Sequence, residues 1–236
     1  MADRIDEESK RFGGFLRKQD LEDHKVEWVN PIHVDYHGYQ VWELPPNGQG
    51  IVALMALNVL NNFQFKDRDV DCIHTQMEAL KMAFADAKEY VTDPKCMNMP
   101  VDDLISVDYG KQRASQIGHL ALPPRVDKPH GSGTVYLCTA DKDGNMVSYI
   151  QSNYMGFGSG IVVDGVSLQN RGYDFSLDPS HVNYLMPHKK TYHTIIPGFL
   201  TKDDKPVGPF GVMGGYMQPQ GHMLSLIHIS EPTRRS

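Results

Sequence analysis

The feature that most constrains this chain is a run of small residues that leads into a threonine and then into a hairpin. Gly131-Ser132-Gly133 precede Thr134, and residues 134–140 and 146–150 are rich in Val, Tyr and Thr, which favour strands. Asp143-Gly144-Asn145 lies between them and supplies residues that tolerate the positive φ angles of a tight turn. The pattern predicts two antiparallel strands, the first of which begins at Thr134.

This position makes Thr134 a candidate nucleophile. A threonine hydroxyl is a poor nucleophile near neutral pH, but cleavage of the Gly133–Thr134 bond would free an α-amine beside it. The ordinary pKa of such an amine is about 8, so its neutral fraction could accept the hydroxyl proton. One residue would then be both nucleophile and base. The alternative is an ordinary glycine-led hairpin that is never cut, and the residues alone leave it open.

Composition excludes several classes of protein. The chain has 236 residues, 40% of them hydrophobic, which is enough for a substantial core. Its net charge of -6 and its scattered Lys and Arg argue against a nucleic-acid surface, and no membrane partner is indicated. Three cysteines without C-x-x-C spacing suggest neither a zinc site nor a disulfide framework. Residues 1–10 are charged and lack the apolar run of a signal peptide, which favours the cytoplasm unless residues precede Met1.

Helices dominate the first half of the chain after one hairpin. Residues 32–36 and 39–44 alternate across His37-Gly38, as in a hairpin, and the run at 45–50 predicts a loop. Residues 51–60 are apolar on nearly every face, which predicts a fully buried helix. A second helix is predicted by an apolar stripe, with a shorter one over 108–117; the stripe consists of Ile73, Met77, Leu80, Phe84, Ala87 and Val91.

Strands dominate the second half. Short apolar runs at 161–163, 166–169, 194–200 and 206–213 are bounded by Gly, Asp and Pro, as strands commonly are. Helices followed by strands indicate an α+β fold.

Several motifs together resemble the γ-glutamyltransferase family of N-terminal-nucleophile hydrolases. They occur in family order across residues 10–223, and they are residues 43–50, 78–86, 141–145 and 157–160, Asp174-Phe175 and Gly214-Gly215. The resemblance implies a four-layer αββα sandwich, of which this chain would be a piece incomplete at both ends. It also implies that a precursor cuts itself before Thr134 into a large and a small subunit. No metal or organic cofactor is implied.

The resemblance assigns roles to further residues. Ser152 corresponds to a hydroxyl residue that assists maturation and orients the nucleophile, although an ordinary Ser at a strand end fits the same position. Gly214 and Gly215 correspond to the pair whose backbone N–H groups hold the developing oxyanion. Asp174 corresponds to the carboxylate that binds the α-amino group of a small-molecule γ-glutamyl substrate.

Four expected pocket residues depart from the family pattern. Tyr154 and Arg171 each replace an amide side chain, and His193-Thr194 replaces a pair of serines that hold the substrate carboxylate. Arg171 could still bind a carboxylate with its planar fork. We therefore expect a preference for a short acidic amide, such as an oxamate-like molecule, or for a bulkier acyl group over glutathione. The alternative is that these residues only pack the pocket wall and leave specificity unchanged.

The resemblance also divides the chain. Residues 1–133 correspond to the C-terminal part of the large subunit and residues 134–223 to the N-terminal part of the small subunit. Family members begin well upstream and carry a substrate-binding Arg without a counterpart here. Residues 224–236 resemble a translated sequencing adapter, so we expect the family match to stop near Met223 and this tail to stay outside the fold.

Two other classes of function fit parts of the sequence. One is a non-catalytic, β-rich binding domain in which Thr134 is an ordinary strand residue. The other is a metal-dependent hydrolase that uses His181, His188 and His193, but their spacing matches no familiar ligand pattern and the nearby lysines would repel a cation.

Overall fold

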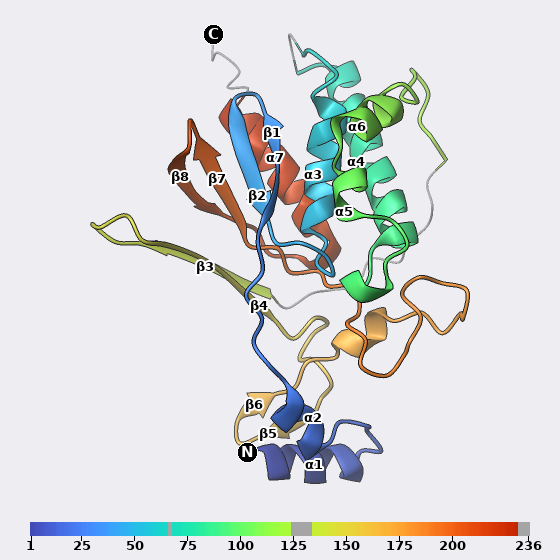
Figure 1. Cartoon of the computed structure of the whole chain (residues 1–236), viewed down its shortest axis with the longest axis vertical. Coiled ribbons are helices and arrows are strands. Elements are labelled where there is room, and N and C mark those ends of the chain that lie inside the picture. The colour runs from blue at the N-terminus through green and yellow to red at the C-terminus, as the bar shows by residue number, and fades with distance from the viewer. Residues whose placement is uncertain (66–67, 124–133, 231–236) are drawn as a thin grey trace.

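A computed structural model of the chain describes residues 1–65, 68–123 and 134–230 (Figure 1). These residues contain both helices and antiparallel strands, which confirms the predicted mixture of the two. No helix among them combines the length and apolar character needed to cross a membrane.

The main sheet joins strands from opposite ends of the chain. Its order is β1 (Ile32–Tyr36), β2 (Tyr39–Glu43), β7 (Gly198–Lys202) and β8 (Lys205–Phe210), and all neighbours are antiparallel. The predicted first hairpin is confirmed, with Tyr36 opposite Tyr39. Across β2 and β7, Trp42 Nε1 donates a 2.9 Å hydrogen bond to Thr201 Oγ1. The sheet therefore brings the segment that follows β2 close to the segment that precedes β7.

Helix α3 (Gly50–Leu60) is the centre of the core. Every one of its residues is buried, as the apolar sequence predicts. It packs on β1 and β2 and contacts α4 (Val70–Tyr90), α6 (Val107–Ala114) and α7 (Gln218–Ser230). Figure 1 shows these helices gathered on one side of the sheet. A helix covered on all sides needs no polar face, which explains its sequence.

The predicted buried face of α4 was wrong at the start of the helix, whereas Ala87 and Val91 are buried as predicted. Ile73 and Met77, expected in the apolar stripe, are 52% and 58% exposed. Ala79 and Ala83 are buried instead, in the same core cluster as the residues of α3. Small side chains allow two helices to approach closely, and that packing gain decides which face turns inward. Glu78, which is not part of the predicted apolar stripe, is also buried, and Lys81 Nζ donates to its Oε1 at 2.7 Å.

The second hairpin forms where the sequence predicts it. β3 (Thr134–Ala140) and β4 (Met146–Ser152) are antiparallel, and Gly144 takes φ +85° in the turn. Figure 1 shows the hairpin reaching out from the body of the protein. Ser148 Oγ donates to Gly198 O at 2.9 Å, which joins the hairpin to β7. Gly211 lies under the Tyr136 ring, where a Cβ atom would come within 2.4 Å of it.

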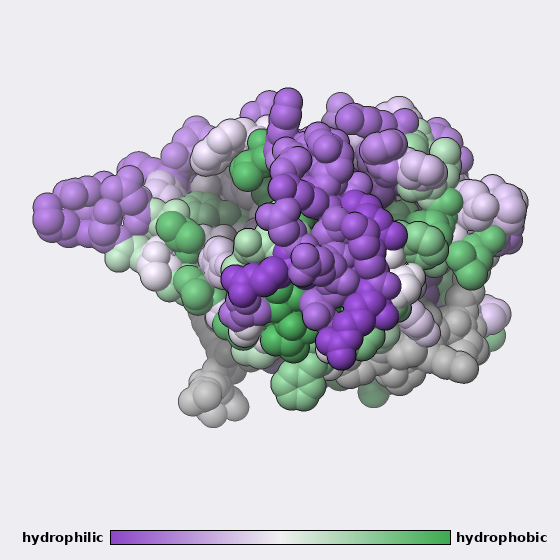
Figure 2. All heavy atoms as spheres, turned by 90° about the horizontal axis from the view of Figure 1, so that it is seen from below, coloured by the Kyte–Doolittle hydropathy of each residue, from purple (hydrophilic) through white to green (hydrophobic). Residues whose placement is uncertain are grey.

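The remaining elements are short. The structure has α1 (Ala2–Arg11), α2 (Lys18–Asp23), α5 (Val101–Leu104), β5 (Val162–Val163), β6 (Val166–Ser167) and 3₁₀ helices at Pro94–Cys96, Arg171–Asp174 and Gly215–Met217. Arg4 pairs with Asp164 at 2.6 Å, which ties α1 to the β5–β6 turn. Figure 2 views this end and shows mainly hydrophilic side chains at its centre, with hydrophobic ones beside them.

The strand predicted over 194–200 begins only at Gly198, and the one predicted over 206–213 runs from Lys205 to Phe210. Within the described residues, the layers are a helical layer, the four-stranded sheet and the β3–β4 hairpin. The full four-layer sandwich therefore stays a proposal for a longer protein.

Helix α7 includes part of the tail that we expected to lie outside the fold. Leu226 and Ile227 are buried in the core cluster. One turn earlier, His222 Nδ1 and Glu43 Oε1 are 2.6 Å apart, and both side chains are fully buried. The expectation that this tail takes no part in the fold is not met up to Ile227.

Candidate active site

Thr134 and Ser152 meet at the open end of the β3–β4 hairpin. They are opposite each other in the strand register, and Thr134 Oγ1 donates a 3.1 Å hydrogen bond to Ser152 Oγ. Ser152 Oγ also accepts the backbone N–H of Tyr154 at 2.9 Å. Thr134 is 7% exposed, so its hydroxyl lies inside the protein surface. Gly133 and the bond expected to be cut lie outside the described residues.

Tyr154 connects this hydroxyl pair to Asp174 through its hydrogen bonds. Its backbone takes φ +76° just after β4, which turns its ring inward. The phenol donates to Asp174 Oδ1 at 2.5 Å. Tyr216 donates to the same oxygen at 2.8 Å. Burial, with the negative charge of Asp174, raises the pKa of both phenols well above the ordinary value, so both hold their protons as donors.

Arg171 lies against the same cluster. Its Nη1 donates to Thr194 Oγ1 at 2.5 Å and is 3.9 Å from Asp174 Oδ2. The guanidinium carbon is 4.5 Å from the centroid of the Tyr154 ring, in cation–π geometry. Burial lowers the pKa of Arg171, and the charge of Asp174 opposes that change. Within the described residues, Nε and Nη2 have no hydrogen-bond partner.

His193 is neutral in this setting. Burial, with the positive charge of Arg171, lowers the pKa of His193 to about 3. Its Nδ1 accepts the Ile195 N–H at 3.3 Å. Near pH 7 the imidazole therefore adds no positive charge beside Arg171.

Gln49 was not predicted as a site residue, yet it holds two of the predicted segments together. Its Nε2 donates to Thr194 O at 2.6 Å and to Gly215 O at 2.8 Å, and its backbone N–H donates to His193 O at 2.8 Å. The side chain is fully buried. The sequence signal was available in the 43–50 motif, where Gln49 lies between two glycines, but the motif predicted only a loop.

The two glycines occupy conformations that other residues rarely adopt. Gly214 has φ +138° and Gly215 has φ +58° at the start of a 3₁₀ turn. A Cβ atom on Gly214 would meet Met217 Cε at 2.8 Å. Gln49 donates to the carbonyl of Gly215, and the next residue, Tyr216, donates to Asp174. This is the kind of restraint that an oxyanion site needs, because its N–H groups must point in a set direction.

Most of the predicted residues therefore form one connected set. Contacts lead from Thr134 through Ser152 and Tyr154 to Asp174, where Arg171 and Tyr216 also meet. From there they continue to Thr194 and, through Gln49, to Gly215. Residues as far as 166 positions apart contribute to it. Tyr216 was missed because nothing in the local pattern distinguishes a tyrosine that follows two glycines.

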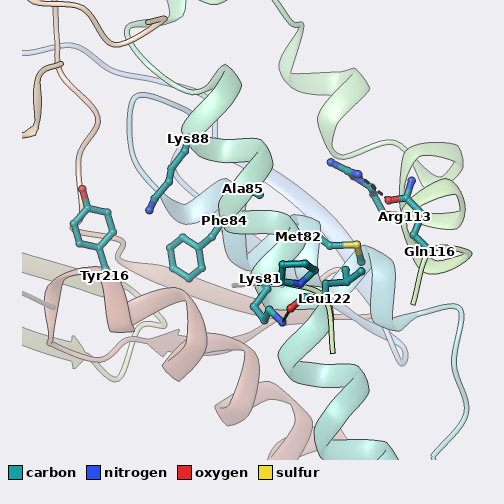
Figure 3. A pocket seen from close by; sticks show the side chains of 10 residues that line it. Lys81, Met82, Phe84, Ala85, Lys88, Arg113, Gln116, Leu122 and Tyr216 are labelled. Atoms are coloured by element: carbon teal, nitrogen blue, oxygen red, sulfur yellow. Dashed lines mark hydrogen bonds between the residues drawn. The ribbon is translucent and has the colours of Figure 1, made fainter. Parts of the chain in front are cut away.

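A hollow of about 460 Å³ borders the cluster on the side of α4. Figure 3 shows Phe84 and Lys88 projecting from α4 toward Tyr216, with Arg113 and Gln116 at the other side. Tyr216 therefore contacts Asp174 with its hydroxyl and lines the hollow with its ring. In the described part of the chain, no group of three or more His, Cys, Asp or Glu side chains is placed to hold a metal ion.

Comparison with known proteins decides the family. The family model described as gamma-glutamyltranspeptidase matches residues 1–232. The chain belongs to the gamma-glutamyltranspeptidase family. The match continues past Met223, where we expected it to end.

The relatives within this family have different names. The glutathione hydrolase-like YwrD proenzyme of Bacillus subtilis (strain 168) is 41% identical over 93% of the chain and 43% of its own length. The oxamate amidohydrolase proenzyme of Klebsiella pneumoniae is 33% identical over 93% of the chain and 42% of its own length. The crystal structure of cephalosporin acylase from Bacillus halodurans superposes with a TM-score of 0.91 at 56% identity, covering 98% of this chain and 43% of that one. The chain thus spans less than half the length of these relatives.

Proposed function

We propose that this chain is part of a γ-glutamyltransferase-like amidohydrolase whose precursor cuts itself between Gly133 and Thr134. The observation that carries the proposal is the hydroxyl pair formed by the buried Thr134, the first residue of β3, and the half-buried Ser152, 3.1 Å apart. Its connection to Asp174 and Gly215 supports the same conclusion, because a nucleophile, a charged binding group and a restrained glycine pair belong to one site.

In the proposed maturation step, the Thr134 hydroxyl attacks the carbonyl carbon of Gly133. The peptide bond becomes an ester by an N-to-O acyl shift, and water then hydrolyses the ester and leaves a new N-terminal Thr134. Ser152, already hydrogen-bonded to the hydroxyl, orients it in both steps. Residues 1–133 would form the C-terminal part of the large subunit, and residues 134–223 would form the N-terminal part of the small subunit.

In the proposed catalytic cycle, the freed α-amine of Thr134 takes the hydroxyl proton, and the oxygen attacks the carbonyl of an amide substrate. The N–H groups of Gly214 and Gly215 bind the oxyanion, and one such donor is worth about 3 kcal/mol. The amine product leaves, and water or a second amine takes the acyl group. These residues supply the nucleophile, the base and the oxyanion donors, so the mechanism uses no metal or organic cofactor.

The substrate we propose is a γ-glutamyl compound or a related acyl amide. Tyr154, Arg171 and the His193-Thr194 pair line the cluster in place of the side chains of the family pattern. An oxamate amidohydrolase and a cephalosporin acylase are among the similar proteins, and both names denote hydrolysis of amides other than glutathione. We therefore propose a short acidic amide or a bulkier acyl group as the better substrate.

Mass spectrometry of the purified full-length protein tests the proposal. Two chains are expected, the smaller of which begins at Thr134. Thr134→Ala should give one uncut chain, and Thr134→Ser, which keeps a hydroxyl, should still be cut. Thr139→Ala removes an exposed threonine from the same strand and is the matched control. An uncut parent protein, or cleavage at another bond, would favour the binding-domain alternative.

A further inference from the structure

The acidic group expected to bind a substrate amine is already engaged in this chain. Asp174 Oδ1 accepts hydrogen bonds from the hydroxyls of both Tyr154 and Tyr216, and Oδ2 faces the Arg171 guanidinium at 3.9 Å. The Asp174 side chain is 3% exposed. An ammonium group would have to displace a phenol to reach Oδ1, and at Oδ2 it would lie beside the positive charge of Arg171, which would repel it.

The guanidinium of Arg171, in contrast, has N–H donors that no described residue accepts. Nη1 is bonded to Thr194 Oγ1, whereas Nε and Nη2 have no hydrogen-bond partner within the described residues. Nε and one terminal nitrogen form an edge of the planar fork, which matches the two oxygens of a carboxylate. The Arg171 side chain is 5% exposed. A buried cation with unused donors is costly unless an anion meets it.

The neighbours of Arg171 hold this fork in place. The Tyr154 ring lies 4.5 Å from the guanidinium carbon, Thr194 fixes Nη1 and Asp174 balances part of the charge. His193 is next to Thr194 and carries no competing charge near pH 7. The local groups therefore orient Arg171 without using the edge that a carboxylate would take.

We propose that Arg171 binds the free carboxylate of the acyl donor, and that the hydroxyls of Tyr154 and Tyr216 prevent an α-ammonium group from binding to Asp174. The preferred donor is a monoamide of a dicarboxylic acid that lacks an α-amino group. This inference rests on the proposed amidohydrolase function, because it names the substrate of that same site.

Two anilides that differ only in the α-ammonium group test the inference on the matured full-length protein. Glutaryl p-nitroanilide has a free carboxylate alone, and γ-glutamyl p-nitroanilide has the same carboxylate with the ammonium beside it. We expect kcat/KM to be at least about tenfold higher for the glutaryl compound, since one lost charged contact corresponds to roughly ten- to a hundredfold. Butyryl p-nitroanilide lacks the carboxylate and is the control substrate.

Two variants assign the effect to residues. Arg171→Gln should lower kcat/KM for glutaryl p-nitroanilide by roughly ten- to a hundredfold, mainly through KM, and leave the butyryl compound little changed. A general structural defect would lower both. Tyr154→Phe removes one hydroxyl from Asp174 and should shift the preference toward the γ-glutamyl anilide by roughly tenfold. Self-cleavage of each variant, seen by mass spectrometry, shows that it has folded.

The outcomes separate the inference from the proposed function. Normal cleavage with a preference for the γ-glutamyl anilide would overturn the inference and leave the Thr134 mechanism intact. An uncut protein would overturn the proposed function. In that case calorimetric binding of glutarate and of L-glutamate still decides the role of Arg171, because tighter binding of L-glutamate contradicts it and tighter binding of glutarate, lost in Arg171→Gln, supports it.

Discussion

Gln49→Met tests whether one buried amide holds the site together. The substitution keeps the length of the side chain and removes its donor and acceptor. Nε2 is the hydrogen-bond donor to both Thr194 O and Gly215 O, and all these groups lie in buried residues. Leaving a buried carbonyl without its donor costs about 1–3 kcal/mol. With two carbonyls affected, we expect the free energy of unfolding to fall by about 3 kcal/mol.

The assay is urea unfolding of the full-length protein in a Thr134→Ala background, which keeps the polypeptide in one piece. Gln19→Met is the matched control, because Gln19 is exposed and its side chain bonds, among the described residues, to Asp23 on the same helix. It should change the unfolding free energy by less than about 0.5 kcal/mol. In the protein with Thr134 intact, Gln49→Met should also lower kcat by roughly tenfold or more through the position of Gly215. A loss of stability below about 1 kcal/mol would refute the reasoning.

Two further predictions concern pH and packing. The pKa of His193 is lowered to about 3, so between that pH and its ordinary value near 6.5 the unfolded chain binds a proton that the folded chain does not. The contribution of His193 to the free energy of unfolding is therefore fully present above about pH 6.5 and falls by up to about 1.4 kcal/mol per pH unit below it. His193→Asn should flatten this slope in urea unfolding between pH 4 and 7. An unchanged slope would contradict the assignment. Gly110→Ala should lower the unfolding free energy by about 1 kcal/mol although alanine favours helices, because its Cβ would meet Asn58 O at 2.8 Å. Gly118→Ala is the control, since no atom of the described residues lies within 4 Å of its added Cβ. Equal effects of the two changes would show that the close contact is not the cause.

The parts of the fold that the sequence predicted are those set by local pattern. Alternating or β-favouring residues around a tight turn predicted both hairpins, and an apolar run with no polar face predicted α3. The buried face at the start of α4 could not be predicted in this way. Large apolar residues such as Ile73 suggested one buried face, but the face that carries Ala79 and Ala83 is the one that is buried. Close packing depends on the partner helix, which a single segment does not reveal.

The candidate site shows the same division. Thr134, Ser152 and Asp174 were predicted through motif resemblance, and the structure brings them into one set of contacts. Gln49 and Tyr216 were not predicted. Their roles depend on pairings between distant segments, such as the bond from Gln49 to Gly215 across 166 positions. The predicted strand over 194–200 starts late for a related reason, because the carbonyl of Thr194 is bonded to the Gln49 side chain.

The residues that depart from the family pattern contact one another, and this explains why they occur together. Tyr154 stacks on Arg171 and bonds to Asp174, and Arg171 bonds to Thr194. Burial, with the positive charge of Arg171, lowers the pKa of His193. Exchanging Tyr154 for the amide of the family pattern would remove the ring from the Arg171 guanidinium and the phenol from Asp174, a loss of about 1–3 kcal/mol. Contacting residues also couple, so the effects of single exchanges do not add. The arginine in this place is therefore held by the ring of Tyr154 and by the hydroxyl at position 194.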